Sequence, residues 1–455
     1  MPRPQRMRRQ SPRLEALPYK AKNTARRRRR LSGGTSLSDD ALAVVFSKLP
    51  GAADVVRCAA TYAQWGRVVA THAATISRLV PPPLGRFLPQ VAAGVFHLQR
   101  DGPTARTRST PGAPQPCFLP LASGRRLLGC QAPTFVGSLF FNVDAAVFDY
   151  SRPVACRNGR LVLELHGGGG GDSLTLCVCS PVTGDAVVLP PMGDRPANYA
   201  CALLTGEDDL HQRRGAEFFR LLLVYNRPGG LTALRCYSSD IGGWGAEARS
   251  PVKVSSRELR HTGPAVVLHG AAFWPLDHGA LAVAVRPNNP NADDPPAPER
   301  QQTGGFDVHL LPYDCPHDWT TQKRLGISPD NRLFLVYIGT YWHGPLLAKI
   351  SYFNIPRDDI GRGKKESSSD EVGVPMRQME VEWRDFKLLK LRWVGEKSGL
   401  VLFTIASGRH SGTHGLNLRE GTVEKLADEG HSWGNLIGFE VDWATYLASL
   451  PHTQN

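Results

Sequence analysis

The stretch SRPVACRNGRLVLEL, residues 151–165, contains a tight-turn dipeptide, Asn158-Gly159, that leads directly into the apolar run Leu161–Leu165. Turn residues beside short apolar runs are typical of β-hairpins. A similar order of turn and apolar run returns later in the chain, at 330–338 and at 397–405. The sequence therefore predicts short strands joined by tight turns.

Short apolar runs bounded by turn residues continue through residues 118–450, which predicts an all-β domain. From Phe135 to Leu450 there are roughly 315 residues, and at about 40–50 residues per blade they would build six to eight blades of a β-propeller. A propeller suits brief strands because its closed ring leaves only short, protected sheet edges. Two polar insertions, 286–305 and 357–373, are predicted to be surface loops.

Residues 36–80 have a helical pattern instead. Ser38 can cap a first helix and Pro50-Gly51 can end it, while further helices are predicted from Asp54 and around Trp65. The apolar residues that share one face of the first helix, by their i, i+3, i+4, i+7 spacing, are Leu42, Val45, Phe46 and Leu49. Three short helices make a small domain that is marginally stable on its own.

The first 30 residues hold twelve basic residues and one acidic residue, and so carry +11 of the net charge of +13. The segment 1–35 is poor in apolar residues and is predicted to be disordered, since burial cannot offset its ordering entropy. A candidate nuclear-import signal is the run Arg26, Arg27, Arg28, Arg29 and Arg30. A contact for RNA or acidic partners, an organelle presequence and a solvated tail without a function are the alternatives. The rest of the chain is nearly neutral, which argues against nucleic-acid binding through its charge.

Motifs that carry chemistry are few. No stretch approaches the roughly 20 apolar residues of a membrane span. The nine cysteines include no C-x-x-C and the histidines have no metal-ligand spacing, so neither a metal nor a cofactor is predicted. Ser432 lies in a G-x-S-x-G motif typical of hydrolases, but the preceding residues 424–429 are too polar for the required buried strand. Because only 21 residues follow Gly434, no catalytic residue is predicted, and a hydrolase that uses Ser432 is kept as a minor alternative.

Residues 37–80 resemble an F-box. That motif opens with Leu and an acidic turn, continues with a helix that ends in Leu-Pro, and then has an Arg-Cys pair and a Trp-containing helix. The matching residues are Leu37, Asp39, Leu42, Val45, Phe46, Leu49, Pro50, Val55, Val56, Arg57, Cys58 and Trp65. The sequence departs from the family at Ser38, where Pro is usual, and at Ala63-Gln64, where Cys-Lys is usual. The resemblance implies that all the matching residues except Asp39 bind a Skp-type adaptor.

The downstream region resembles the associated repeat domain of plant F-box proteins, which is a propeller or propeller-like. Among the stretches that carry this likeness are SRPVACRNGRLVLEL (151–165), LRCYSSDIGGW (234–244) and FEVDWATYLASL (439–450). The expected fold class is therefore an α-helical F-box followed by a mainly antiparallel β-propeller-like domain. The expected divisions are a disordered tail (1–35), the F-box (36–80), a linker (81–117) and a substrate-binding β domain (118–450).

The family implies a non-catalytic substrate receptor of an SCF-type E3 ubiquitin ligase. The F-box would bind a Skp-type adaptor and through it a cullin, and the β domain would bind a protein target. A location in the nucleus and/or cytoplasm follows, without a membrane or nucleic-acid partner. The alternative is a stand-alone propeller that binds a small molecule or glycan, with the helices only capping it.

Overall fold

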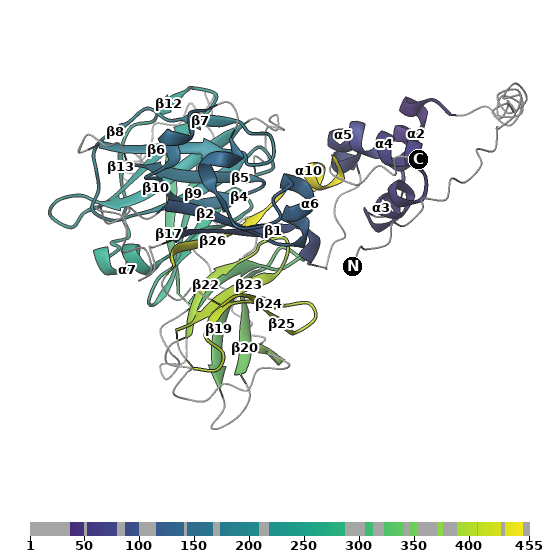
Figure 1. Ribbon diagram of the computed structural model, residues 1–455. Helices are drawn as coiled ribbons and strands as arrows, with labels where there is room; N and C mark the ends of the chain where they lie inside the picture. The colour runs from purple at the N-terminus through teal and green to yellow at the C-terminus, as the bar shows by residue number, and fades with distance from the viewer. Residues whose placement is uncertain are drawn as a thin grey trace, which may run out of the picture.

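A computed structural model describes residues 37–49, 52–79, 87–99, 115–140, 143–166, 173–208, 218–286, 305–312, 323–340, 346–353, 371–375, 389–406, 408–428 and 433–448. The predicted tail with Arg26–Arg30 lies outside these residues, as do Pro50 and most of the two predicted insertions. Figure 1 shows a large β part and a group of helices beside it.

Six antiparallel sheets make up the β part of the described chain. The first five-stranded sheet contains β4 (Arg152–Arg157), β5 (Arg160–Leu165), β6 (Ser173–Cys179) and β7 (Ala186–Val188), and β8 (Met192–Asp194) pairs with β6. The second contains β9 (Tyr199–Thr205), β10 (Phe219–Asn226), β11 (Thr232–Ser238) and β12 (Gly243–Trp244), and β13 (Ala248–Arg249) pairs with β11. Two four-stranded sheets follow in the chain, with β14 (Val266–Leu268), β15 (Ala271–Pro275), β16 (Gly279–Val285) and β17 (Phe306–Pro312), and with β18 (Lys323–Ile327), β19 (Leu333–Thr340), β20 (Leu346–Phe353) and β21 (Glu371–Pro375). The last two comprise β22 (Leu389–Val394), β23 (Leu400–Ile405), β24 (Gly412–Asn417) and β25 (Thr422–Ala427), and β26 (Gly434–Glu440), β1 (Ala92–Gln99), β2 (Gln115–Pro120) and β3 (Thr134–Phe135).

The first strand of each sheet contacts the first strand of the next. The contacts run from β4 through β9, β14, β18, β22 and β26 and back to β4, so the ring is closed. Apolar cores fill the space between neighbouring sheets, as where Phe334 of β19 packs in one cluster with Phe403 of β23. This is a β-propeller, as the repeated hairpins predicted, and its six sheets lie at the lower end of the expected range.

One sheet joins the two ends of the propeller. The five others consist of strands consecutive in the chain, whereas β26 pairs with β1 in a sheet that continues through β2 and β3. Phe96 of β1 lies opposite Ile437 of β26 on one side and opposite Phe118 of β2 on the other. Closure of the ring therefore depends on a strand from each end of the domain.

The predicted boundaries around this sheet need correction. Within the predicted linker 81–117, the structure has η1 (Pro89–Val91), all of β1 and the first residues of β2. The apolar run of β1 is short and stands alone in the sequence, so its strand character only becomes evident once β26 lies beside it. The propeller begins at β1 instead of at residue 118.

Four helices lie in the predicted helical region, α2 (Asp39–Phe46), α3 (Ala52–Thr61), α4 (Ala63–Thr71) and α5 (Ala73–Leu79). The hydroxyl of Ser38 accepts a hydrogen bond from the backbone N–H of Ala41 at 3.2 Å, which confirms the predicted cap. Helix α5 was not predicted, and one of its residues, Ile76, is completely buried.

The helices are not isolated from the propeller. The C-terminal helix α10 (Trp443–Ala448), which follows β26, contacts both α4 and α5. Trp443, Tyr446 and Leu447 belong to the same apolar cluster as Ile76 and as Phe439 of β26. In Figure 1, α10 bridges the β part and the helical group. The propeller region also contains four short helical elements: helix α6 (Ala122–Leu128), helix α7 (Ser256–His261) and the 3-10 turns η3 (Val136–Leu139) and η4 (Ala145–Phe148).

Two histidines are buried between sheets with one ring nitrogen unsatisfied. His97 of β1 stacks on Trp433 with 3.6 Å between ring centroids, and its Nδ1 has no hydrogen-bond partner. His414 of β24 donates from Nε2 to the carbonyl oxygen of His410 at 3.0 Å, and its Nδ1 is likewise unpartnered. Burial lowers the pKa of both imidazoles to about 4, because the cation would have to leave water.

These histidines predict a loss of stability in mild acid. Their folded pKa lies below the ordinary value of 6.5, so the unfolded chain binds more protons between pH 6.5 and pH 4. We expect each histidine to reduce the free energy of unfolding by roughly 2 kcal/mol between pH 7.5 and pH 5. Urea unfolding at the two pH values measures this. His97→Phe should keep the ring stacking and remove about half of the pH effect, and the exposed His278→Gln is the control.

Candidate functional site

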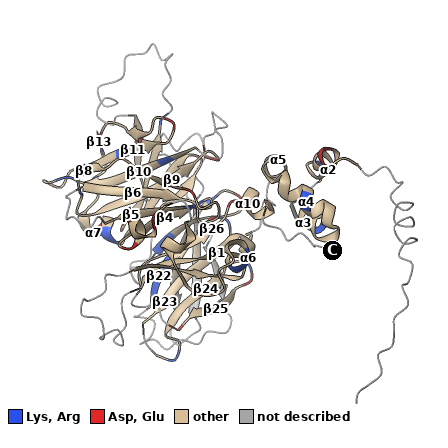
Figure 2. Cartoon of the chain, turned by 45° about the horizontal axis from the view of Figure 1, so that its top comes forward, with Lys and Arg blue, Asp and Glu red and all other residues tan. Residues whose placement is uncertain are grey.

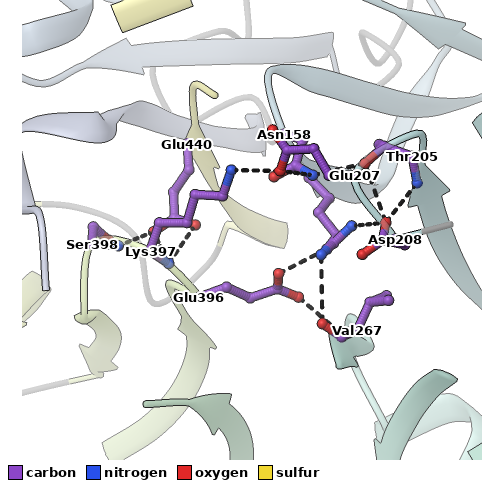
Figure 3. A network of polar contacts seen from close by, with 10 residues as sticks. Asn158, Thr205, Glu207, Asp208, Val267, Glu396, Lys397, Ser398 and Glu440 are labelled. Atoms are coloured by element: carbon purple, nitrogen blue, oxygen red, sulfur yellow. Dashed lines mark hydrogen bonds and ion pairs between the residues drawn. The ribbon is translucent and has the colours of Figure 1, made fainter. Parts of the chain in front are cut away.

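A network of buried charges gathers turns from several sheets. Arg157, the last residue of β4, donates from Nε to Glu396 Oε2 at 2.7 Å and from Nη1 to Asp208. The side chain of Arg157 is only 11% exposed, and both carboxylates are similarly buried. Glu396 lies in the turn after β22 and also accepts from the backbone N–H of Val267 in β14 at 2.9 Å. Figure 3 shows Asp208, Glu396 and Val267 in this network, and through its bonds to them Arg157 joins four sheets.

The second half of the network joins the same turns through other atoms. Lys397 Nζ forms an ion pair with Glu207 Oε2 at 3.0 Å, and Asn158 Nδ2 donates to that oxygen at 3.1 Å. Glu440, at the end of β26, accepts from the backbone N–H of Ser398 at 2.6 Å. Asn158 has the left-handed φ of 48°, which the predicted Asn-Gly turn requires.

Burial and charge pairing act in opposite directions in this network. Burial alone lowers the pKa of Arg157, but Asp208 and Glu396 outweigh it and raise that pKa. Burial raises the pKa of Glu396, and Arg157 only partly reverses this. For Lys397, burial lowers the pKa and Glu207 raises it. Since each of these three side chains has an opposite charge beside it, the network can hold neighbouring sheets in register, which is a structural task.

The structure offers little support for chemistry at the hydrolase-like motif. β25 ends at Ala427 and β26 begins at Gly434, so the motif at 430–434 lies between two strands. A nucleophile elbow needs a strand before the serine and a helix after it. Ser432 itself lies outside the described residues.

Other reactive sites are equally few in the described part of the chain. No group of three or more His, Cys, Asp or Glu side chains there is placed to hold a metal ion. Burial raises the pKa of the Cys201 thiol to about 12, which keeps it protonated and unreactive. None of the helices in the described ranges is long and apolar enough to cross a bilayer.

The residues predicted to bind an adaptor fall into three groups. Leu42, Phe46 and Val55 are buried in the helical core of the chain itself. Leu49, Val56, Cys58 and Trp65 are partly buried against that core. Leu37, Val45 and Arg57 are exposed, and Arg57 forms an ion pair with Asp54. Only the side chains of the last group are exposed in the free chain and so accessible to a partner.

The exposed apolar surface of the helices extends beyond the predicted residues. Leu37, Val44 and Val45 are 55%, 60% and 48% exposed. Tyr62 is also exposed, and its ring contacts Trp65, whose ring in turn packs edge-on against Phe46. Val44 and Tyr62 were missed because neither occupies a position of the F-box pattern. Their exposure follows only from how the four helices pack.

Basic and acidic residues both occur along the described strands of the propeller. Figure 2 shows basic and acidic residues interspersed along the sheets, with an acidic segment in α2. Asp39 and Asp40 form this acidic first turn, beside the exposed Leu37. A partner of the helices would therefore meet an apolar surface with an acidic border.

Comparisons with known proteins give distant similarities. No family model matches the chain, and no curated protein matches it. A solved structure described as "Structural and Mechanistic Analysis of Two Prolyl Endopeptidases" is 9% identical with a TM-score of 0.33, over 79% of this chain and 53% of that one. A dipeptidyl peptidase 4 of Porphyromonas gingivalis is 9% identical with a TM-score of 0.27, over 76% and 53%. The chain spans about half the length of these structures, and the propeller assignment stands on the closed ring of its own six sheets.

Proposed function

We propose that this chain is the substrate receptor of an SCF-type ubiquitin ligase, in which the α2–α5 helices bind a Skp-type adaptor and the propeller binds a protein target. The observation that carries the proposal is the exposed apolar surface formed by Leu37, Val44 and Val45. Exposed apolar side chains that lie close together, unlike single ones, are typical of protein interaction sites. The F-box resemblance of the same helices names an adaptor as the partner.

The contact between the helices and the propeller supports the same two roles, adaptor binding by the helices and target binding by the propeller. A ligase receptor has to hold its target at a fixed place relative to the adaptor. Helix α10 contacts α4 and α5 while its chain continues directly from β26 of the ring. A target on the propeller would thus be held at a defined position from the adaptor, and the ubiquitin transfer would belong to the recruited partners.

The proposal keeps the expected location in the nucleus and/or cytoplasm. The run Arg26–Arg30 would supply nuclear import. The adaptor and cullin would be met in either compartment.

Binding of a Skp-type adaptor tests the proposal directly. We expect the double change Val44→Glu with Val45→Glu to weaken binding about 100-fold or more, because each change places a charge where an apolar contact is needed. Both side chains are exposed in the free chain, so the melting temperature should hardly change. Isothermal titration of the full chain with the purified adaptor measures the affinity.

The matched control is Ile241→Glu, which changes an apolar residue of the propeller that is 78% exposed. It should leave adaptor affinity unchanged. Leu49→Ala is a poorer test, because Leu49 packs partly against the helical core and its loss mixes stability with binding. If the wild-type chain binds no Skp-type adaptor, the receptor proposal fails and the stand-alone binding propeller becomes the better account.

A further inference from the structure

A second arginine, Arg324, lies partly buried in the centre of the propeller, and none of the described residues is an acidic partner for it. Arg324, the second residue of β18, lines a small cavity together with Arg157, Glu396 and Glu440. Its Nε donates to the carbonyl oxygen of Arg392 at 3.2 Å and its Nη1 to that of Lys323 at 2.9 Å. No carboxylate of the described residues forms an ion pair with it.

The residues around Arg324 increase the free-energy cost of leaving its charge without an ion-pair partner. Apart from Arg157, Glu396 and Glu440, the cavity is lined by Cys156 and by the apolar residues Pro264, Ala265, Val266, Leu325, Trp393 and Val394. Burial and, to a smaller extent, the neighbouring Arg392 together lower the pKa of Arg324 to about 10, so the guanidinium still carries its charge at neutral pH. Buried charges in proteins are normally paired.

The acids of the same cavity are already engaged. Glu396 binds Arg157 through Oε2 and the backbone N–H of Val267 through Oε1. Glu440 accepts from the backbone N–H groups of Lys397 and Ser398. Among the described residues, Arg324 forms its hydrogen bonds with backbone carbonyl oxygens and none with either carboxylate.

We propose that the cavity at the centre of the propeller binds a carboxylate group through Arg324. The planar guanidinium matches the two oxygens of a carboxylate, and the apolar wall strengthens the attraction by excluding water. The cavity is small, so only the carboxylate end of a ligand fits it. The group could come from a free small acid or from an acidic side chain of a bound protein. This site does not depend on adaptor binding.

Thermal unfolding of the full chain in sodium acetate tests the site. For a dissociation constant near 10 mM, we expect 100 mM acetate to raise the melting temperature by roughly 2 °C above that in sodium chloride of equal ionic strength. Arg324→Met should abolish this difference and should not itself lower the melting temperature much, because it removes an unpaired buried charge. Arg257→Met, at an exposed arginine of α7, should keep the difference.

Two further measurements show whether the bound carboxylate belongs to a free acid or to a protein side chain, and whether loss of the response comes from a misfolded variant. Arg324→Lys keeps the charge without the planar fork and should lose most of the response. N-acetyl-aspartate amide offers only a side-chain carboxylate, and a rise equal to that in acetate would favour a protein ligand, whereas a response to acetate alone would favour a free acid. An equal rise in chloride, no rise in acetate, or an unchanged rise in Arg324→Met would each overturn the proposal.

Discussion

We expect that a fragment of residues 118–455 will not form the closed propeller. It lacks half of β2 and all of β1, the strand that joins β26 to β2, and so leaves β26 without its partner strand. Val95 and Phe96 are fully buried, and Phe96 lies 4.7 Å from the ring of Phe118 and 5.4 Å from that of Phe439. Truncating one buried Phe costs about 3–5 kcal/mol, while whole domains are stable by only about 5–15 kcal/mol.

Calorimetry and dye binding measure this outcome. The fragment 118–455 should show no cooperative melting transition and should bind a hydrophobic dye. A fragment of residues 87–455 is the matched control, since it loses the helices α2–α5 but keeps β1. It should melt cooperatively with a strand-rich circular dichroism spectrum. A cooperative transition in the shorter fragment would mean that β26 does not need β1, contrary to the closure seen here.

The change Arg157→Met should destabilise the propeller by about 3–5 kcal/mol. It leaves Asp208 and Glu396 buried without their shared cation, and an unpaired buried charge carries a penalty of this size. The penalty should shrink in mild acid, where Glu396 can take up a proton and become neutral; its pKa is already raised by burial. Urea unfolding at pH 7.5 and pH 5 gives both numbers.

Two further variants show whether the loss comes from stranded charges. Arg332→Met removes an arginine from a pair with Asp330 in which the side chains are 38% and 48% exposed, and should cost less than about 1 kcal/mol. The triple change Arg157→Met, Asp208→Asn and Glu396→Gln should recover much of the stability, because no buried charge is left unpaired. A single change that costs as little as Arg332→Met would contradict a structural role for the network.

The local features of this fold were predictable from the sequence. The expected turn at Asn158-Gly159 is present, and Asn331 also has the left-handed φ, 59°, that such turns favour. The apolar run predicted at Leu161–Leu165 is β5, Arg160–Leu165. In these places the side-chain pattern and the turn residues lie within a few positions of one another, so a single stretch of sequence contains the whole signal.

Features that join distant segments were not predictable. Arg157 precedes a turn and looks like an ordinary surface arginine, but Asp208 is 51 residues away and Glu396 is 239 residues away. No periodicity relates these positions. Arg324 was not predictable either, because what distinguishes it is that no acidic residue of the described chain forms an ion pair with it.

The pairing of β1 with β26 has a consequence for synthesis. A ribosome makes β1 early and β26 close to the end, and about 335 residues separate Gln99 from Gly434. At roughly 5–20 residues per second, β1 waits on the order of 20 to 70 seconds for its neighbour. During that time its unpaired edge and buried aromatic residues are open to wrong partners. The nascent chain should therefore depend on chaperones until its last strand leaves the ribosome.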